Sequence, residues 1–237
     1  MTNSKEAAAL QALEYVVDDM VLGLGTGSTT AFFIDHLGNK LATGELKGIS
    51  GVPTSENSAT RARNLGIPLT TLTDHPVLDL AVDGADEVDP QLNLIKGLGR
   101  ALLREKVVEV HAKKFVVIVD DSKLVPRLGM HIPLPVEILP FEHAAHLRWL
   151  NSLGCQAELW LEDNGSPVVT DNGNYLAKCW FRRDQSSTEL IGIDDPNRLA
   201  GLLSVRPGII EHGLFLGMAD QVIVAGNQGI SIIERPR

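Results

Sequence analysis

The sequence is poor in the features that mark secreted, membrane-spanning and redox proteins. It has two cysteines, Cys155 and Cys179, which form no Cys-x-x-Cys pair, so neither a metal site nor a redox motif is indicated. No apolar run approaches the about 18 residues that a membrane helix needs. The first residues lack the positive segment and apolar core of a secretory signal. We therefore expect a cytoplasmic protein with reduced thiols and no membrane partner.

A surplus of positive charge is also absent. Lys and Arg number 21 against 30 Asp and Glu, which gives a formal net charge of −9. The longest basic clusters are the dipeptides at 113–114 and 182–183, too short to bind a phosphate backbone, so we expect no nucleic-acid partner. What is present is ordinary globular composition, 44% hydrophobic and 22% charged, in 237 residues. That length fits one or two domains with a hydrophobic core.

The first half of the chain alternates predicted strands and helices. The patterns predict helices over 5–17, 28–41, 55–65 and 98–110, and strands over 20–24, 49–52, 68–72, 78–82 and 115–119. Ser28 is a candidate N-cap for the second helix. This order predicts a Rossmann-like α/β fold, a mostly parallel sheet with helices on both faces. In such sheets, ligands bind at the carboxyl ends of the strands.

The pattern changes near Pro126. Short strands are predicted at 136–139, 157–161, 168–170 and 175–181, with Asp-Asn-Gly turn signals at 163–165 and 171–173, and helices at 142–153 and 196–205. The apolar run at 221–225 is expected to return to the first sheet. We therefore predict an α/β domain formed by 1–127 and 206–237, with a smaller α+β domain, 128–205, inserted into it.

A glycine-rich segment follows the first predicted strand. Residues 23–30 read Gly-Leu-Gly-Thr-Gly-Ser-Thr-Thr and lead into a helix. Glycines let a backbone approach a ligand closely, and the free N–H groups of a helix start attract anions. The spacing lacks the third glycine of a dinucleotide fingerprint and the lysine of a P-loop, so a smaller phosphate is the better fit. An ordinary glycine-rich turn is the alternative.

Three acids crowd the end of the strand at 78–82. The segment 83–87 reads Asp-Gly-Ala-Asp-Glu, and its first residue, Asp83, should lie at the carboxyl end of that strand. Mutual repulsion is expected to raise some of their pKa values, which is typical of functional sites. Hydrogen bonding to sugar hydroxyls fits the segment better than calcium, because the calcium-loop spacing is missing. A solvated acidic turn remains the alternative.

The segment 96–106 combines a lysine, two glycines and a carboxylate. Glu105, unlike Arg104 or Lys106, has mostly apolar neighbours at helical spacing. We therefore expect its side chain to lie on the buried apolar stripe of the predicted helix. Loss of hydration would raise its pKa towards neutrality, as a general base needs. Lys96 and helix-start amides near Gly97 and Gly99 could then stabilise developing negative charge. The alternative places Glu105 at the edge of the stripe, in a salt bridge.

A further lysine follows the strand at 115–119. Residues 120–123 read Asp-Asp-Ser-Lys, so Lys123 also falls at the carboxyl end of a strand. There it could neutralise an anionic ligand, and an exposed loop lysine is the alternative.

Taken in order, these four segments resemble the ribose-5-phosphate isomerase A family. The resemblance includes the segments 134–137 and 169–174 and spans nearly the whole chain. It implies an isomerase, formally an intramolecular oxidoreductase, that interconverts ribose 5-phosphate and ribulose 5-phosphate in the pentose phosphate pathway. It also implies no cofactor, no metal and a homodimer or homotetramer.

The resemblance further implies roles for individual residues. Glu105 would be the base that moves a proton between C1 and C2 through an enediolate, Asp83 would serve ring opening, and Asp86 and Lys96 would lie close to the reacting oxygens. The implied substrate-binding residues are Thr26, Gly27, Ser28, Thr29, Gly84, Ala85, Gly97, Leu98, Gly99 and Lys123. The sequence departs from the family pattern at Leu98, where a glycine is usual, and at Arg100, where a small residue is usual.

Three other interpretations stay open on the sequence. A sugar-phosphate sensor without turnover would bind ribose 5-phosphate but form no product. An amino-sugar-phosphate deaminase would release ammonia. A metal-dependent isomerase would lose activity in EDTA.

Overall fold

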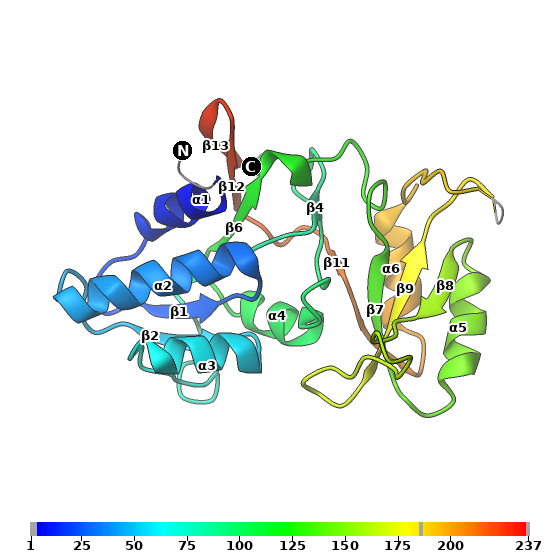
Figure 1. Cartoon of the computed structure of the whole chain (residues 1–237), viewed down its shortest axis with the longest axis horizontal. Helices are drawn as coiled ribbons and strands as arrows, with labels where there is room; N and C mark the ends of the chain where they lie inside the picture. The colour runs from blue at the N-terminus through cyan, green and yellow to red at the C-terminus, as the bar shows by residue number, and fades with distance from the viewer. Residues whose placement is uncertain (1–3, 185–186, 236–237) are drawn as a thin grey trace. The chain divides into compact units, whose positions relative to one another are not determined.

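The computed structural model describes residues 4–184 and 187–235, which form two compact units (Figure 1). Unit 1 comprises Met1–Ala85, Arg104–Lys123 and Gly217–Arg237, and unit 2 comprises Asp86–Leu103 and Leu124–Leu216. This division assigns residues 86–103 to unit 2 along with most of the second half of the chain. The domain boundaries predicted above, at 127/128 and 205/206, stay a prediction.

Unit 1 is built on a six-stranded sheet with the order β13-β12-β6-β3-β1-β2. Five strands are parallel, and β13 pairs antiparallel with β12 at one edge. The elements are α1 (Ser4–Leu13), β1 (Val21–Leu24), α2 (Ser28–Thr43), β2 (Ser50–Pro53), α3 (Glu56–Asn64), β3 (Leu80–Asp83), α4 (Leu102–Glu109), β6 (Phe115–Asp120), the 3-10 turn η1 (Asp121–Lys123), β12 (Gln221–Gly226) and β13 (Gly229–Glu234).

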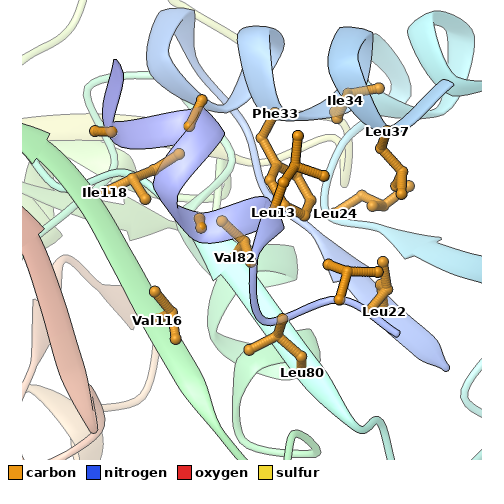
Figure 2. Close-up of a cluster of buried hydrophobic side chains, with 14 of the residues drawn as sticks. Leu13, Leu22, Leu24, Phe33, Ile34, Leu37, Leu80, Val82, Val116 and Ile118 are labelled. Atoms are coloured by element: carbon orange, nitrogen blue, oxygen red, sulfur yellow. The ribbon is translucent and has the colours of Figure 1, made fainter. Parts of the chain in front are cut away.

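Alternate strand residues supply the two packed faces of this sheet. Leu22 and Leu24 of β1 point to the same side as Phe33 and Leu37 of α2, where they form a dry core with α1 (Figure 2). Gly23, between the two leucines, points to the opposite face. A Cβ on it would come within 2.9 Å of Val108 of α4, so the absence of a side chain lets this helix lie close to β1. Helices thus cover both faces, and the predicted α/β class is confirmed.

The two ends of α3 follow local sequence rules, whereas the start of α2 does not. Ser55 caps α3 by accepting a hydrogen bond from Ser58 N at 3.0 Å, and Gly66 follows the helix with φ of 71°. The predicted N-cap of α2, Ser28, is wrong, because Gly27 occupies the cap position with φ of 122°. A glycine there brings no side chain to satisfy the first amides of the helix.

The described residues of unit 2 form two antiparallel sheets and two helices. Its four-stranded sheet has the order β10-β7-β9-β8 and its three-stranded sheet the order β11-β5-β4. The elements are β4 (Glu87–Val88), β5 (Leu94–Ile95), β7 (Leu134–Ile138), α5 (His143–Asn151), β8 (Gln156–Leu159), β9 (Tyr175–Trp180), α6 (Pro196–Ser204), β10 (Ile209–His212) and β11 (Leu214–Phe215). Leu134, Val136 and Ile138 alternate along β7 and enter one core with Leu150 of α5 and Leu203 of α6.

The two cysteines, far apart in the sequence, are neighbours in this core. Both are buried free thiols, and a hydrogen bond between them lowers the pKa of Cys155 and, together with burial, raises the pKa of Cys179. Their contact in this core was not predicted from the sequence.

Several predicted boundaries are wrong. The first helix ends at Leu13, and the helix expected from 98 begins at Leu102. The predicted strands at 68–72 and 168–170 reduce to single bridges, Gly51 with Leu69 and Val169 with Tyr175. The strand at 221–225 does join the first sheet, as predicted, but its antiparallel neighbour β13 was missed. None of the described helices is long and apolar enough to cross a membrane.

Candidate active site

The strand order of unit 1 points to one edge of its sheet. The chain leaves β1 for β2 on one side, whereas β3, β6 and β12 follow one another on the other side. In open parallel sheets, such a reversal opens a crevice at the carboxyl ends of the two central strands, and ligands bind there. The residues that follow β1 are 25–29, and β3 ends at Asp83. The glycine-rich segment and the first acid therefore meet where a ligand is expected.

Asp83 ties these two strand ends together. Its side chain is 1% exposed, and its Oδ1 accepts hydrogen bonds from Thr26 N at 3.0 Å, Gly84 N at 2.6 Å and the Thr30 hydroxyl at 3.2 Å. A carboxylate held by several donors is fixed in both position and orientation. The sequence prediction that Asp83 lies at the end of its strand is confirmed.

Gly25 is required by the closeness of the two segments. A Cβ on Gly25 would overlap the Asp83 carboxyl group, while Gly25 N donates to Val82 O at 3.1 Å. The glycine therefore serves a close approach within the protein rather than an unusual backbone angle.

The Thr26 side chain is used inside the protein. Its hydroxyl lies 2.7 Å from the Thr54 hydroxyl, 2.8 Å from that of Ser55 and 3.2 Å from that of Ser58. Ser58 in turn donates to Gly25 O at 2.6 Å. This cluster connects the loop after β1 to the start of α3. The family resemblance implied that Thr26 binds substrate, and the structure shows its hydroxyl bonded within the protein.

The start of α2 offers donors to an anion. Gly27 and Ser28 are exposed, and a Cβ on Gly27 would meet no described atom within 4 Å. The first amides of a helix with no side-chain cap attract negative charge. The Lys5 ammonium donates to the Ser28 hydroxyl at 2.9 Å, so a cation accompanies the exposed loop. Lys5 was missed by the sequence analysis, because nothing in its neighbourhood in the sequence marks it.

Glu105 is buried, as predicted. It lies in the first turn of α4 and is 2% exposed. Crossover helices in parallel sheets run antiparallel to the strands, so α4 begins at the carboxyl edge. Val108, three residues on, packs against β1, which places Glu105 on the face of the helix turned to the sheet. This burial argues against a position at the stripe's edge. Arg104 pairs with Glu56, at 2.8 Å.

A second buried carboxylate lies one turn further along α4. Glu109 is 3% exposed and follows Glu105 by four residues, so both side chains point to the same side of the helix. Its burial was not predicted from the sequence.

The remaining predicted residues of unit 1 also follow strand ends. Gly84 and Ala85 come directly after β3, and Lys123 closes the 3-10 turn η1 that follows β6. All three are partly exposed. Because β6 is the neighbour of β3, Lys123 belongs to the same edge of the sheet.

Five predicted residues fall in unit 2, namely Asp86, Lys96, Gly97, Leu98 and Gly99. Asp86 N donates to Ile95 O at 2.8 Å, and Asp86 Oδ2 accepts from Leu98 N at 2.9 Å. Lys96 is 2% exposed, and its Nζ lies 5.4 Å from the centre of the Phe215 ring. Asp86 therefore holds the segment 96–99 by its backbone, next to a shielded ammonium group.

The helix-start amides expected near Gly97 and Gly99 are not present as such. The helix begins only at Leu102, because Gly97 with φ of 112° and Arg100 with φ of 66° keep 97–100 out of it. Leu98 is not in the left-handed region, so its backbone does not need the glycine that is usual in the family. A Cβ on Gly97, in contrast, would press on Leu102 and Pro135.

Glu87 is a structural acid rather than a member of a repelling cluster. It is 1% exposed and accepts hydrogen bonds from Gly129 N at 2.5 Å, His131 N at 2.7 Å and Ile132 N at 3.2 Å. Burial raises its pKa, against the lowering effect of these amides. The expectation that crowding by neighbouring carboxylates raises pKa values in this segment is thus corrected for Glu87.

Among residues 4–184 and 187–235, no three His, Cys, Asp or Glu side chains form a group that could hold a metal ion. Unit 1 thus presents a doubly wound α/β sheet whose switch point combines an anion-attracting helix start, a fixed aspartate and a buried glutamate. These features define a class of protein that binds a small anionic ligand beside carboxylates.

Comparison with known proteins places the chain within that class. Residues 50–229 match the family model of ribose 5-phosphate isomerase A (phosphoriboisomerase A). The ribose-5-phosphate isomerase A of Roseiflexus castenholzii is 49% identical over 232 residues, which cover 98% of this chain and 95% of that protein. The chain belongs to the ribose 5-phosphate isomerase A family, as the sequence resemblance indicated.

Solved structures agree in fold. A D-ribose-5-phosphate isomerase in complex with phospho-erythronic acid is 45% identical, with a TM-score of 0.91 and coverage of 98% of each chain. The ribose 5-phosphate isomerase from Plasmodium falciparum is 35% identical, with a TM-score of 0.91 and coverage of 99% of each chain.

Proposed function

We propose that the chain interconverts D-ribose 5-phosphate and D-ribulose 5-phosphate, a step of the pentose phosphate pathway, by proton transfer through an enediolate. The observation that carries the assignment is the buried Glu105 at the sheet edge that also holds the anion-attracting loop and Asp83, in a chain of this family. An aldose–ketose shift needs a base for a carbon-bound proton and donors for the oxygens that gain charge.

Glu105 is the proposed base. It takes the proton from C2 of the aldose and returns it to C1, while a proton leaves the O2 hydroxyl and one is added to O1, or the reverse. Because Glu105 is 2% exposed, few water molecules compete with the substrate for its carboxylate. Its place in a helix that packs on β1 fixes the direction from which it approaches the substrate.

The substrate's phosphate group is proposed to bind at the start of α2. The loop 26–29 supplies amide donors and the exposed Ser28 hydroxyl, and Lys5 supplies a positive charge. Lys123 adds a second cation at the neighbouring strand end. Binding a phosphate far from the reacting carbons provides orienting energy for the proton transfer. A relative solved with phospho-erythronic acid supports a phosphorylated four- or five-carbon ligand.

The other carboxylates and Lys96 are assigned to the reacting oxygens. Asp83, fixed by three donors, is proposed to exchange a proton with the ring oxygen during ring opening. Asp86 positions the backbone of 96–99, and the Lys96 ammonium is proposed to stabilise the enediolate oxygen. We propose that Gly84, Ala85, Gly97, Leu98 and Gly99 line the substrate, and that no cofactor takes part.

The test compares two buried carboxylates on one helix. Glu105→Gln should abolish turnover in a coupled ribose 5-phosphate assay and abolish exchange of the substrate's carbon-bound proton in D2O, while a phosphate-bearing competitor still binds. Glu109→Gln, the matched control, should lower stability but retain exchange. Turnover by Glu105→Gln near the wild-type rate would refute the assignment, and activity that is lost in EDTA would refute the metal-free mechanism.

We also propose that the protein works as a cytoplasmic homodimer or homotetramer. The exposed edge strand β13 supports association, because Ile230 and Ile232 are each 43% exposed and Ile233 36%. Edge strands with unpaired backbone and apolar side chains are usually covered. Light scattering after size exclusion, with Ile232→Lys as the variant, measures the subunit number.

A further inference from the structure

Arg100 adopts a backbone conformation that arginine rarely takes. Its φ is 66°, in the left-handed region where a Cβ crowds the following carbonyl oxygen. Glycine at this position would carry no such cost. A strained non-glycine residue persists only where its surroundings hold it in place, so the contacts of the Arg100 side chain are informative.

Those contacts all come from the connection between β8 and β9. Arg100 Nη1 donates to Glu162 Oε1 at 2.5 Å, and Nη2 donates to Glu162 Oε2 at 3.0 Å. The guanidinium carbon lies 5.4 Å from the centre of the Trp160 ring, which also receives the Lys178 ammonium at 4.5 Å. A planar fork paired with a carboxylate and stacked over an aromatic ring is specific to arginine.

The receiving segment is itself well anchored. Trp160 and Glu162 are two residues apart in an extended stretch, so both side chains point the same way. Trp160 N donates to Leu176 O at 2.8 Å and Val168 N donates to Trp160 O at 2.9 Å. Glu162 N donates to Ser166 O at 2.8 Å. Arg100 is therefore held by a rigid partner rather than by a free loop.

On the other side of the contact is the segment that carries Lys96. Its beginning is fixed by Lys96 N, which donates to Gly213 O at 2.9 Å, and by Leu98 N, which donates to Asp86. Arg100 fixes its end, two residues later. The segment 96–100 is thus held at both ends within unit 2.

We propose that Arg100, Glu162 and Trp160 form a clamp that positions the segment 96–100, and that Arg100 is a positioning residue for the isomerisation. This inference rests on the proposed function for its kinetic consequence. With the clamp intact, the Lys96 ammonium keeps one place relative to Asp86. Without it, the segment samples several conformations and the oxygen that gains charge is less well stabilised. Binding of the phosphate, by residues of unit 1, is unaffected.

The clamp predicts a loss in kcat with little change in KM. Arg100→Ala and Glu162→Gln should each lower kcat about tenfold, as small misplacements of catalytic groups do. Because both variants break one contact, the double variant should be no slower than either single variant. Arg100→Lys should recover part of the loss, since it retains the charge without the fork. Arg183→Ala, which breaks the exposed pair with Glu189, is the control and should leave kcat unchanged.

Arg100→Gly distinguishes the effect of losing the side-chain clamp from the effect of the strained backbone at position 100. It relieves the left-handed conformation and removes the side chain, so the clamp predicts a kcat as low as that of Arg100→Ala. A wild-type kcat in Arg100→Gly, additive effects in the double variant, or equal effects in Arg183→Ala would overturn the proposal.

Hydrogen exchange provides a readout that does not depend on activity. Amides of residues 96–101 should exchange faster in Arg100→Ala and Glu162→Gln than in the wild type, and at the wild-type rate in Arg183→Ala. If the wild-type protein fails to isomerise ribose 5-phosphate, the proposed function is wrong, and this exchange pattern still decides whether the clamp exists. Unchanged exchange in both variants would overturn it.

Discussion

The backbone N–H of Thr26 donates to Asp83 Oδ1 at 3.0 Å, and this bond joins the carboxyl ends of two neighbouring parallel strands. Thr26 belongs to the loop that leads into α2, and Asp83 ends β3. The positions of the anion-attracting loop and of the aspartate therefore depend on each other, and a change in either should displace both.

Gly25→Ala tests whether the positions of the loop and of Asp83 depend on each other. The added Cβ would overlap the Asp83 carboxyl group, so the loop and the carboxylate must move apart. We expect kcat/KM to fall at least about 100-fold, the scale of the cost when reacting groups are misplaced by an ångström. Steady-state kinetics with ribose 5-phosphate measures the loss.

Gly201→Ala is the matched control. This glycine lies inside α6, and a Cβ there would meet no described atom within 4 Å. The substitution should leave kcat/KM unchanged and raise the free energy of unfolding by about 0.5–1 kcal/mol through helix propensity. Wild-type kinetics in Gly25→Ala would contradict the close packing of Gly25 and Asp83.

Substitutions of Thr26 and Ser28, two residues apart, are predicted to have different effects, the first on stability and the second on KM. Thr26→Val removes a hydroxyl that contacts three others, so it should lower the free energy of unfolding by about 0.5–1.5 kcal/mol, the net contribution of a typical hydrogen bond. Ser28→Ala removes an exposed hydroxyl and should leave stability unchanged while raising KM. Urea unfolding and steady-state kinetics separate the two effects, and a KM effect without destabilisation in Thr26→Val would contradict the structural role.

The positions predicted correctly from the sequence are those that depend on strand order and on helical spacing. Asp83 follows a buried apolar run and therefore ends a strand, and Glu105 shares a helical face with apolar residues and is therefore buried. Both inferences need only local periodicity and the rule that parallel strands end at one edge.

What the sequence did not predict depends on contacts between distant segments. The apolar spacing from Leu98 onwards is typical of a helix, yet the left-handed conformations of Gly97 and Arg100 delay its start to Leu102. Arg100 meets Glu162 across 62 positions, and Glu87 bonds amides 42 to 45 positions away. No local pattern encodes such pairs, because the tertiary fold brings them together.

Lys5 gives a prediction for phosphate affinity. Its ammonium lies 2.9 Å from the Ser28 hydroxyl, so it adds positive charge where we propose that the phosphate binds. Lys5→Met should raise KM about tenfold and leave kcat nearly unchanged, because the contact is equally present in the bound substrate and the transition state. The KM of the wild type should also rise more steeply with salt than that of the variant.

Lys40→Met is the control for Lys5. Lys40 lies in the last turn of α2, at the end opposite to the loop, and pairs with Glu45 at 3.0 Å. Its loss should leave KM and its salt dependence as in the wild type. An unchanged KM in Lys5→Met, or an equal rise in Lys40→Met, would contradict a local role for Lys5.

Glu87 makes stability depend on pH. Burial raises its pKa above the ordinary value of 4.5, so the folded chain binds this proton more tightly than the unfolded chain. Its contribution to stability is therefore fully present below about pH 4.5 and is lost as the pH rises through the raised value of the folded state.

Glu87→Gln removes the titrating group and adds a cost that does not depend on pH, because an amide NH2 then faces backbone N–H donors. Urea unfolding from pH 4.5 to 7, with the exposed Glu158→Gln as control, should show the stability advantage of the wild type over Glu87→Gln shrinking as the pH rises. An advantage that stays constant or grows with pH would show that the three amide hydrogen bonds, rather than burial, dominate the titration of Glu87.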